Sequence, residues 1–128
     1  MSSKERAFAQ LLLEVVDDAF SVLGEAPKRA LYQYLSTVHS LEREEIPDRT
    51  KDFSDGLRKA LGGASFVIQK VILRKLFQRL GHTFKESQGL GFSDYVTDAM
   101  QRFEASMNRY VQHESFEIGR SKKRQVSG

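Results

Sequence analysis

Apolar residues recur every three or four positions in five stretches of the chain, which is the spacing of helices that bury one face. The first stretch runs from about 4 to 23, and Gly24 follows it as a residue that readily ends a helix. The second starts near Pro27, because proline suits the first turn of a helix. Tyr32 lies off the second stripe, which hints at a contact surface. The two predicted stripes are Phe8, Leu11, Leu12, Val15, Val16, Ala19, Val22 and Leu23, and then Ala30, Leu31, Tyr34, Leu35 and Val38.

Residues 40–63 combine a charged loop with a short third helix. Ile46 is expected to be extended, because Pro47 disfavours helix at the residue before it. Asp48 or Thr50 can cap the helix that follows. Gly56 lies inside this helix, where glycine costs about 1 kcal/mol relative to alanine, so we expect close helix packing there. The stripe of this helix and the glycines that end it are Phe53, Leu57, Ala60, Leu61, Gly62 and Gly63.

Residues 64–80 form the most apolar of the predicted helices, and its two sides differ in charge. No acidic residue occurs between Ala64 and Gly81. The first positions, 64–68, are apolar or small and are expected to be buried. The apolar side consists of Phe66, Ile72, Leu73, Leu76, Phe77 and Leu80. The opposite side consists of Lys70, Arg74, Lys75, Gln78 and Arg79.

A glycine-containing linker over 82–91 precedes a fifth predicted helix, which ends near His113 and which Ser93 is expected to cap. This helix either packs onto its own bundle or supports self-association, in which methionines would adapt to an irregular partner. The remainder, 114–128, has no helical period and is expected to be a disordered basic tail. The stripe of the fifth helix is Val96, Ala99, Met100, Phe103, Met107, Tyr110 and Val111.

These patterns predict an all-α fold, a small helical bundle of about five helices with a disordered basic C-terminal tail. The expected division is a four-helix bundle over 1–81, the linker and fifth helix over 82–113, and the tail over 114–128. A length of 128 residues suits one domain with a tail. Hydrophobic residues make up 40% and charged residues 29% of the chain, which is typical of a globular protein rather than a disordered one.

The chain contains no cysteine, which excludes disulfides, thiolate zinc sites and cysteine nucleophiles and favours a reducing compartment. Glu14, Asp17 and Asp18 interrupt the N-terminal apolar stretch, which is unlike a signal peptide. No run of residues is apolar enough to span a bilayer. We therefore expect a soluble, cytoplasmic protein without a membrane partner.

Motifs that carry chemistry are sparse. The three histidines lie in different segments without partners at helical spacing, which predicts surface or loop residues rather than metal ligands. Three glutamates precede Ile46, and a charged loop explains them without catalysis. Gly89 and Gly91 have no third glycine at the spacing of a dinucleotide loop. We therefore expect no enzyme activity, cofactor or metal. The histidines and glutamates are His39, His82, His113, Glu42, Glu44 and Glu45.

The basic side of the fourth helix and the tail supply the candidate contact residues. The first turn of this helix is apolar and cannot read base edges, so the basic groups suit phosphate contacts or an acidic partner. Alternatively, they form a solvated face paired with acidic side chains elsewhere in the bundle. The candidates are Lys70, Arg74, Lys75 and Arg79 in the helix and Lys122, Lys123 and Arg124 in the tail.

Residues 17–81, approximately, contain a characteristic succession of predicted helices, turns and loops. It comprises a helix, a Leu-Gly-Glu turn, a helix with tyrosine and leucine, a charged loop with Ile-Pro, a helix bearing phenylalanine, a glycine and a closing apolar helix. The residues concerned are Leu23, Gly24, Glu25, Tyr34, Leu35, Ile46, Pro47, Phe53, Leu57, Gly62 and Ile72. This order resembles the archaeal nitrosopumilus output domain family. The resemblance implies a small helical module that serves as an output or interaction domain in archaeal signalling proteins, with no catalytic residues to carry over.

Two functional hypotheses follow. The first is a non-enzymatic interaction or output module in archaeal signalling or regulation, with a protein as its partner and with self-association through the fifth helix as a further hypothesis. The alternative is a nucleic-acid-binding accessory protein that uses the basic helix face and the basic tail.

Overall fold

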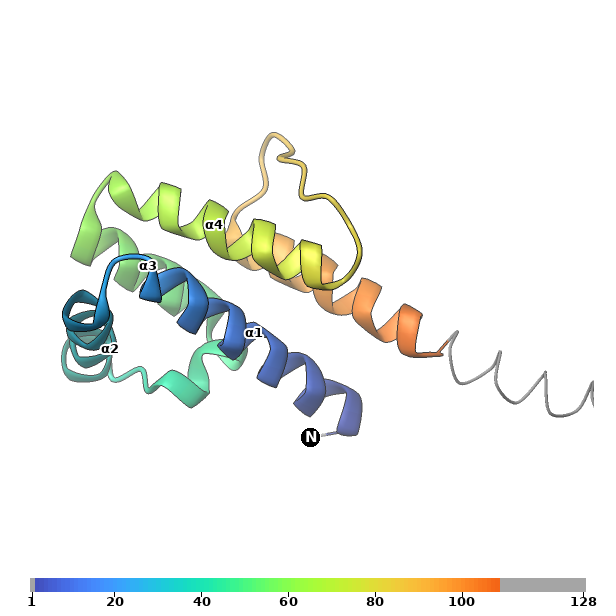
Figure 1. The fold of residues 1–128 in the computed structure, drawn as a ribbon, viewed down its shortest axis with the longest axis horizontal. Helices are drawn as coiled ribbons and strands as arrows, with labels where there is room; N and C mark the ends of the chain where they lie inside the picture. Colours follow the sequence, from blue (N-terminus) through green and yellow to red (C-terminus); the bar gives the residue numbers. More distant parts are fainter. Residues whose placement is uncertain (1, 109–128) are drawn as a thin grey trace, which may run out of the picture.

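The computed structural model of the protein describes residues 2–108, and this part of the chain is a bundle of helices without strands (Figure 1). The predicted all-α fold is therefore confirmed. Tyr110, Val111, His113 and the tail residues Lys122, Lys123 and Arg124 lie outside the described residues. The helices are α1 (Ser3–Ser21), α2 (Glu25–His39), the 3₁₀ helix η1 (Arg43–Asp48), α3 (Thr50–Leu61), α4 (Ala64–Arg79) and a helix over 92–108, here called the C-terminal helix.

One aromatic core holds these helices together. Helices α1 and α4 pack against each other, and α3 packs against both α2 and α4 (Figure 1). Phe53 of α3 is fully buried, and its ring centroid lies 6.1 Å from that of Phe20 in α1 and 5.7 Å from that of Phe92 in the C-terminal helix. Phe8 of α1 meets Phe103 of the C-terminal helix at 5.7 Å. The C-terminal helix therefore packs onto its own bundle through 92–103.

Two helix starts differ from the sequence prediction. Helix α3 has no side-chain cap, so neither Asp48 nor Thr50 caps it as predicted. The Thr50 hydroxyl instead lies 2.8 Å from the hydroxyl of Ser93, which joins α3 to the C-terminal helix. Ser93 therefore does not cap its own helix. The carboxylate of Asp94 accepts the backbone N–H of Gly91 at 2.8 Å, which is the cap contact at this helix start.

Ile46 and Pro47 lie in η1, so the prediction of an extended segment is wrong. Glu42 and Glu45 form a capping box at the start of this short helix, each side chain accepting a backbone N–H of the other residue. Ile46 is fully buried. Burial of this side chain and the capping box together outweigh the local preference that proline imposes on the residue before it.

The predicted apolar stripes include several side chains that lie at the surface. Helix α1 ends at Ser21, so the two apolar residues that follow leave the helical face and are exposed. Helix α1 also packs against α2, α4 and η1 and buries more than one stripe. The wrongly predicted core residues are Val22, Leu23, Ala30, Val38, Ala60, Ala64, Phe66, Val67 and Met107, and the buried residues outside the predicted stripe of α1 are Leu13 and Phe20.

Gly56 marks the close contact between α3 and α2 that its place inside a helix predicted. A Cβ atom added there would lie 2.5 Å from Cδ2 of Leu35 and 3.3 Å from Cδ2 of His39. Leu35 is 1% exposed, so its side chain has little room to move away. The absence of a side chain at Gly56 therefore sets the distance between these helices.

Replacing Gly56 by alanine should destabilise the protein. Overpacking costs about 1–3 kcal/mol and the gain in helix propensity is about 1 kcal/mol, so we expect the free energy of unfolding of Gly56→Ala to fall by about 1 kcal/mol. Urea unfolding followed by circular dichroism measures it. Gly63→Ala is the matched control, because Gly63 has φ −61° and no atom of the described residues lies within 4 Å of an added Cβ. Equal or greater stability of Gly56→Ala relative to the control would contradict the packing argument.

Candidate functional site

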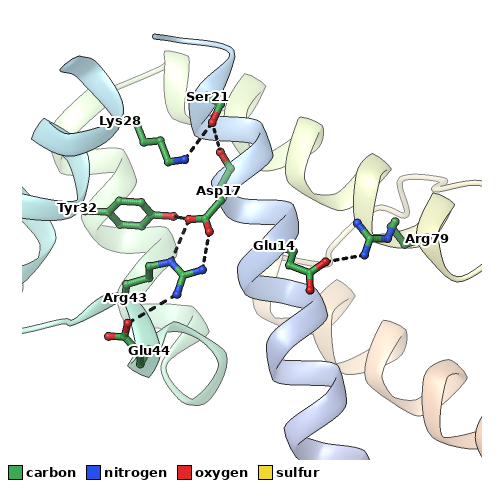
Figure 2. A network of polar contacts seen from close by, with 8 residues as sticks. All are labelled: Glu14, Asp17, Ser21, Lys28, Tyr32, Arg43, Glu44 and Arg79. Carbon is green, nitrogen blue, oxygen red and sulfur yellow. Dashed lines mark hydrogen bonds and ion pairs between the residues drawn. The ribbon is translucent and has the colours of Figure 1, made fainter. Parts of the chain in front are cut away.

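Two of the four basic candidates on α4 are paired within the fold. Lys70 Nζ lies 2.9 Å from Glu86 Oε1, in the connection after α4. Arg79 Nη2 lies 2.8 Å from Glu14 Oε1 on α1 (Figure 2). The remaining helix candidates are Arg74 and Lys75, of which Arg74 is exposed. The three tail candidates, Lys122, Lys123 and Arg124, lie outside the described residues.

Asp17 of α1 connects three elements (Figure 2). The Tyr32 hydroxyl, from α2, donates a hydrogen bond to Asp17 Oδ1. Arg43 of η1 donates two hydrogen bonds to the same carboxylate, from Nε to Oδ1 at 3.0 Å and from Nη2 to Oδ2 at 2.5 Å. The Tyr32 ring also packs 5.1 Å from that of Phe20. The suggestion that Tyr32 belongs to a contact surface is therefore wrong, because its ring and hydroxyl serve contacts inside the fold.

The charge states of Asp17, Tyr32 and Arg43 indicate that this cluster stabilises the junction of α1, α2 and η1. Burial opposes ionisation of Asp17, but the hydrogen bonds from Arg43 and Tyr32 and the charges of Arg43 and Lys28 outweigh it and hold the pKa of Asp17 below its ordinary 3.8. Burial and the hydrogen bond to Asp17 raise the pKa of Tyr32 above its ordinary value. The hydrogen bond to Asp17 likewise raises the pKa of Arg43. These shifts keep the ion pair charged and the tyrosine neutral at pH 7, so the cluster has no group poised to exchange a proton there.

Asp17→Asn should lower the free energy of unfolding at pH 7 by about 1–3 kcal/mol, because hydrogen bonds to a charged group are lost and Arg43 keeps a half-buried charge. Because the folded-state pKa of Asp17 lies below its unfolded value, the contribution exists above about pH 3.8 and is lost as the pH falls through the folded-state pKa. Urea unfolding over pH 2–7 measures the difference from wild type, which should shrink in acid.

The matched control for this prediction is Asp98→Asn. Asp98 pairs with Arg102 four residues later on an exposed helix face, where an ion pair contributes about 0.5 kcal/mol. Equal losses in the two variants, or a loss in Asp17→Asn that is the same at acid and neutral pH, would contradict the assigned role.

A groove runs along α4 where the connection 82–91 passes beside this helix. One hollow of about 190 Å³ lies between α4, the connection and the C-terminal helix. A second, of about 310 Å³, extends to α3 and shares Phe66, Gln69 and Phe92 with the first. We call the two hollows together the α4 groove. Its walls include Phe66, Gln69, Leu73, Phe84, Leu90 and Phe92 in the first hollow and Lys51, Ser54, Asp55, Arg58 and Asp94 in the second.

The wall formed by 82–91 is held in place by specific contacts. The Tyr95 hydroxyl accepts the backbone N–H of Ser87 at 2.8 Å and donates to the carbonyl of the same residue at 2.9 Å. The Phe84 ring packs between Phe77 at 5.4 Å and Tyr95 at 4.9 Å. Together with the ion pair of Lys70 and Glu86, these contacts fix the connection to α4 and to the C-terminal helix. These contacts therefore hold this wall of the groove in a defined position.

Large apolar side chains border the groove at the surface. Phe66 is 55% exposed and Leu90 is 49% exposed, and both line the first hollow. Val67, beside Phe66 on α4, is also exposed. Sequence periodicity wrongly placed Phe66 in the core. Adjacent exposed apolar residues at the rim of a hollow are typical of a contact surface.

Gln69 is the buried polar residue of the groove. Its side chain is 7% exposed and lines both hollows. Its Oε1 accepts a hydrogen bond from the Ser54 hydroxyl at 3.2 Å, while its Nε2 has no partner among residues 2–108. An unpaired buried amide costs free energy, so this group is a candidate binding element. Gln69 is not among the site residues predicted from the sequence, although a glutamine at i+4 from Ser65 and i−3 from Ile72 lies on a core face.

The histidines and glutamates considered from the sequence lie apart in the described chain. The His39 ring packs 5.2 Å from that of Tyr34, and His82 Nδ1 lies 3.3 Å from Arg102. Glu42 and Glu45 cap η1, and Glu44 lies 3.7 Å from Arg43, so the glutamate cluster has structural contacts. Within 2–108 no group of three acidic or histidine side chains is arranged to hold a metal ion. His113 lies outside the described residues.

Comparison with known proteins finds no matching family model, no similar curated protein and no similar solved structure. Between residues 2 and 108, none of the helices combines the length and the apolar character needed to cross a bilayer.

Proposed function

We propose that this protein is a non-enzymatic interaction module that binds an apolar segment of a partner protein in the α4 groove. The observation that carries the proposal is a groove with a wall held by specific contacts and a rim that exposes Phe66 and Leu90. We further propose that the module acts in the cytoplasm in archaeal signalling or regulation. The absence of cysteine and the resemblance of residues 17–81 to the archaeal nitrosopumilus output domain family support this setting.

The charges around the groove favour an uncharged occupant. Basic and acidic side chains occur there in equal number, and two pairs neutralise each other: Arg58 with Asp55, and Lys70 with Glu86. A balanced wall supplies no net attraction for a polyanion or a polycation. The charged residues are Lys51, Arg58, Lys70, Asp55, Asp94 and Glu86.

The shape of the groove favours a chain segment. The two hollows adjoin each other, one lined by α3 and the other by the connection 82–91. Adjacent hollows of this kind can receive successive side chains of an extended or helical peptide. An apolar cavity of about 150 Å³ holds one benzene ring, so the first hollow, of about 190 Å³, suits one large apolar side chain.

A selection of short linear peptides displayed on phage, with the full chain as bait, tests this function. We expect enrichment of peptides with large apolar residues and low net charge. Phe66→Ser combined with Leu90→Ser should lower the affinity for the selected peptides about tenfold, because loss of buried apolar contact at the rim costs about 1.4 kcal/mol or more of binding free energy. Isothermal calorimetry or fluorescence anisotropy measures the affinity.

The matched control for this test is Val38→Ser, which removes an exposed apolar side chain from α2 outside the groove. Its affinity for the selected peptides should be that of wild type. Selected peptides that bind the groove variant as tightly as the control, or the failure of apolar peptides to enrich, would refute the proposal.

The alternative function, nucleic-acid binding, predicts an affinity for DNA that depends on salt. If α4 met phosphates through Lys70, Arg74, Lys75 and Arg79, the affinity for duplex DNA would fall with salt at a log–log slope of about −0.9 per contact. Because two of these residues are paired with glutamates, we expect a chain that ends at 113 to show no measurable affinity for duplex DNA at low salt. Fluorescence anisotropy with labelled DNA measures it. Binding that is lost when all four are changed to glutamine would favour the nucleic-acid alternative.

A further inference from the structure

The amide nitrogen of Gln69 is the buried polar group of the groove whose role the fold leaves open. The carboxamide is held by the hydrogen bond from Ser54 of α3 to Oε1. Its Nε2 carries two N–H donors, and neither finds an acceptor among residues 2–108. A donor that is buried, fixed and unpaired is complementary to an acceptor that arrives with a ligand.

The surroundings of Gln69 restrict what this ligand can be. Phe66, Leu73 and Phe92 line the same hollow, so the part of the ligand beside the amide is apolar. The charged residues that line this hollow, Lys70 and Glu86, form an ion pair, which leaves no unbalanced charge there to hold a carboxylate or a phosphate. The acceptor is therefore a neutral oxygen, and in a protein partner the most abundant such group is the backbone carbonyl.

We propose that Gln69 donates a hydrogen bond from Nε2 to a backbone carbonyl of a neutral peptide segment, one large apolar side chain of which fills the hollow between Phe66, Leu73, Phe84 and Phe92. This inference rests on the proposed function and names the chemistry of its partner. The apolar hollow supplies most of the binding, and the amide selects a peptide over a hydrocarbon of the same shape. Donation to the incoming carbonyl satisfies an amide nitrogen that has no acceptor among residues 2–108.

Small probes separate the amide contact from apolar contact. N-acetyl-phenylalanine N-methylamide carries the side chain and peptide carbonyls, ethylbenzene carries the side chain alone, and 4-phenyl-2-butanone carries the side chain and a carbonyl without an N–H. Titration of the ¹⁵N-labelled full chain, followed by NMR, reports the side-chain amide signals of Gln69 directly. These signals should shift with both carbonyl probes and stay near their starting positions with ethylbenzene.

Gln69→Leu removes the donor and keeps the size of the side chain. It should lower the affinity for both carbonyl probes about fivefold to tenfold, because the net contribution of one hydrogen bond to binding corresponds to this factor. The affinity for ethylbenzene should be unchanged or higher. The substitution should also raise the thermal midpoint of the free protein, because a buried unpaired amide is replaced by an apolar group. Ser65→Ala is the matched control, since the Ser65 hydroxyl is likewise buried without a partner within 2–108 but lines neither hollow. Its affinities should be those of wild type.

The outcomes separate the two proposals. If peptides selected against the full chain need Phe66 and Leu90 but bind Gln69→Leu unchanged, the groove function stands and the role of Gln69 is refuted. If only the probe with N–H groups depends on Gln69, the side chain accepts rather than donates, and the inference is overturned. If no probe shifts signals of groove residues, the peptide site itself is absent.

Discussion

The packing of the Phe53 ring between those of Phe20 and Phe92 is the constraint on which the rest of the structure depends. It brings α1, α3 and the C-terminal helix to one point of the core. Once Phe92 is fixed there, the connection 82–91 must travel from the end of α4 back along the same helix. The α4 groove is the space that this path leaves, so its existence follows from burial of an aromatic side chain outside the first four helices. A chain that ended near Gly81 would lack both a wall of the groove and part of the core.

Two polar clusters in the described part of the chain, around Asp17 and around Gln69, differ in how fully their hydrogen bonds are made. Around Asp17, the carboxylate oxygens accept from Tyr32 and Arg43, and the cluster stabilises the junction of three elements. At Gln69 the oxygen is paired, while the nitrogen has no partner within the described part of the chain. A satisfied buried network contributes to a unique fold, whereas a half-satisfied one lowers stability unless something else completes it. Because its hydrogen bonds are made within the fold, the Asp17 cluster has a structural role, which its shifted pKa values reflect. Because its nitrogen lacks an acceptor within residues 2–108, the Gln69 amide is the candidate binding element.

The sequence predicts the helices well because their period depends on local spacing, and it predicts the close contact at Gly56 because an interior glycine needs a packing reason. It places Ile72, Leu73, Leu76 and Phe77 of α4 correctly in the core, but it fails at the start of this helix, where apolar residues occur on more than one face. Hydrophobicity selects Phe66, while the face that packs in the core contains Ser65, Ile68 and Gln69. Which face turns inward at this end of α4 depends on α3 and on the path of 82–91, and neither has a local signal. The groove could therefore not be placed from the sequence, although its residues lie in elements that were predicted.

The same helix also explains why charge is a weaker guide to function here than apolar exposure. Basic residues on α4 form a conspicuous set along the chain, but the fold supplies Glu14 and Glu86 as partners for two of them, which reduces the field they present to a polyanion. Exposed ion pairs of this kind contribute little to stability, and their energetic effect is to neutralise the helix surface. Phe66 has no comparable compensation, because its exposed ring lies in water at the mouth of a hollow. In the groove, α4 thus presents an exposed apolar surface and a buried amide nitrogen without a partner among residues 2–108, and both are complementary to an uncharged peptide rather than to phosphate.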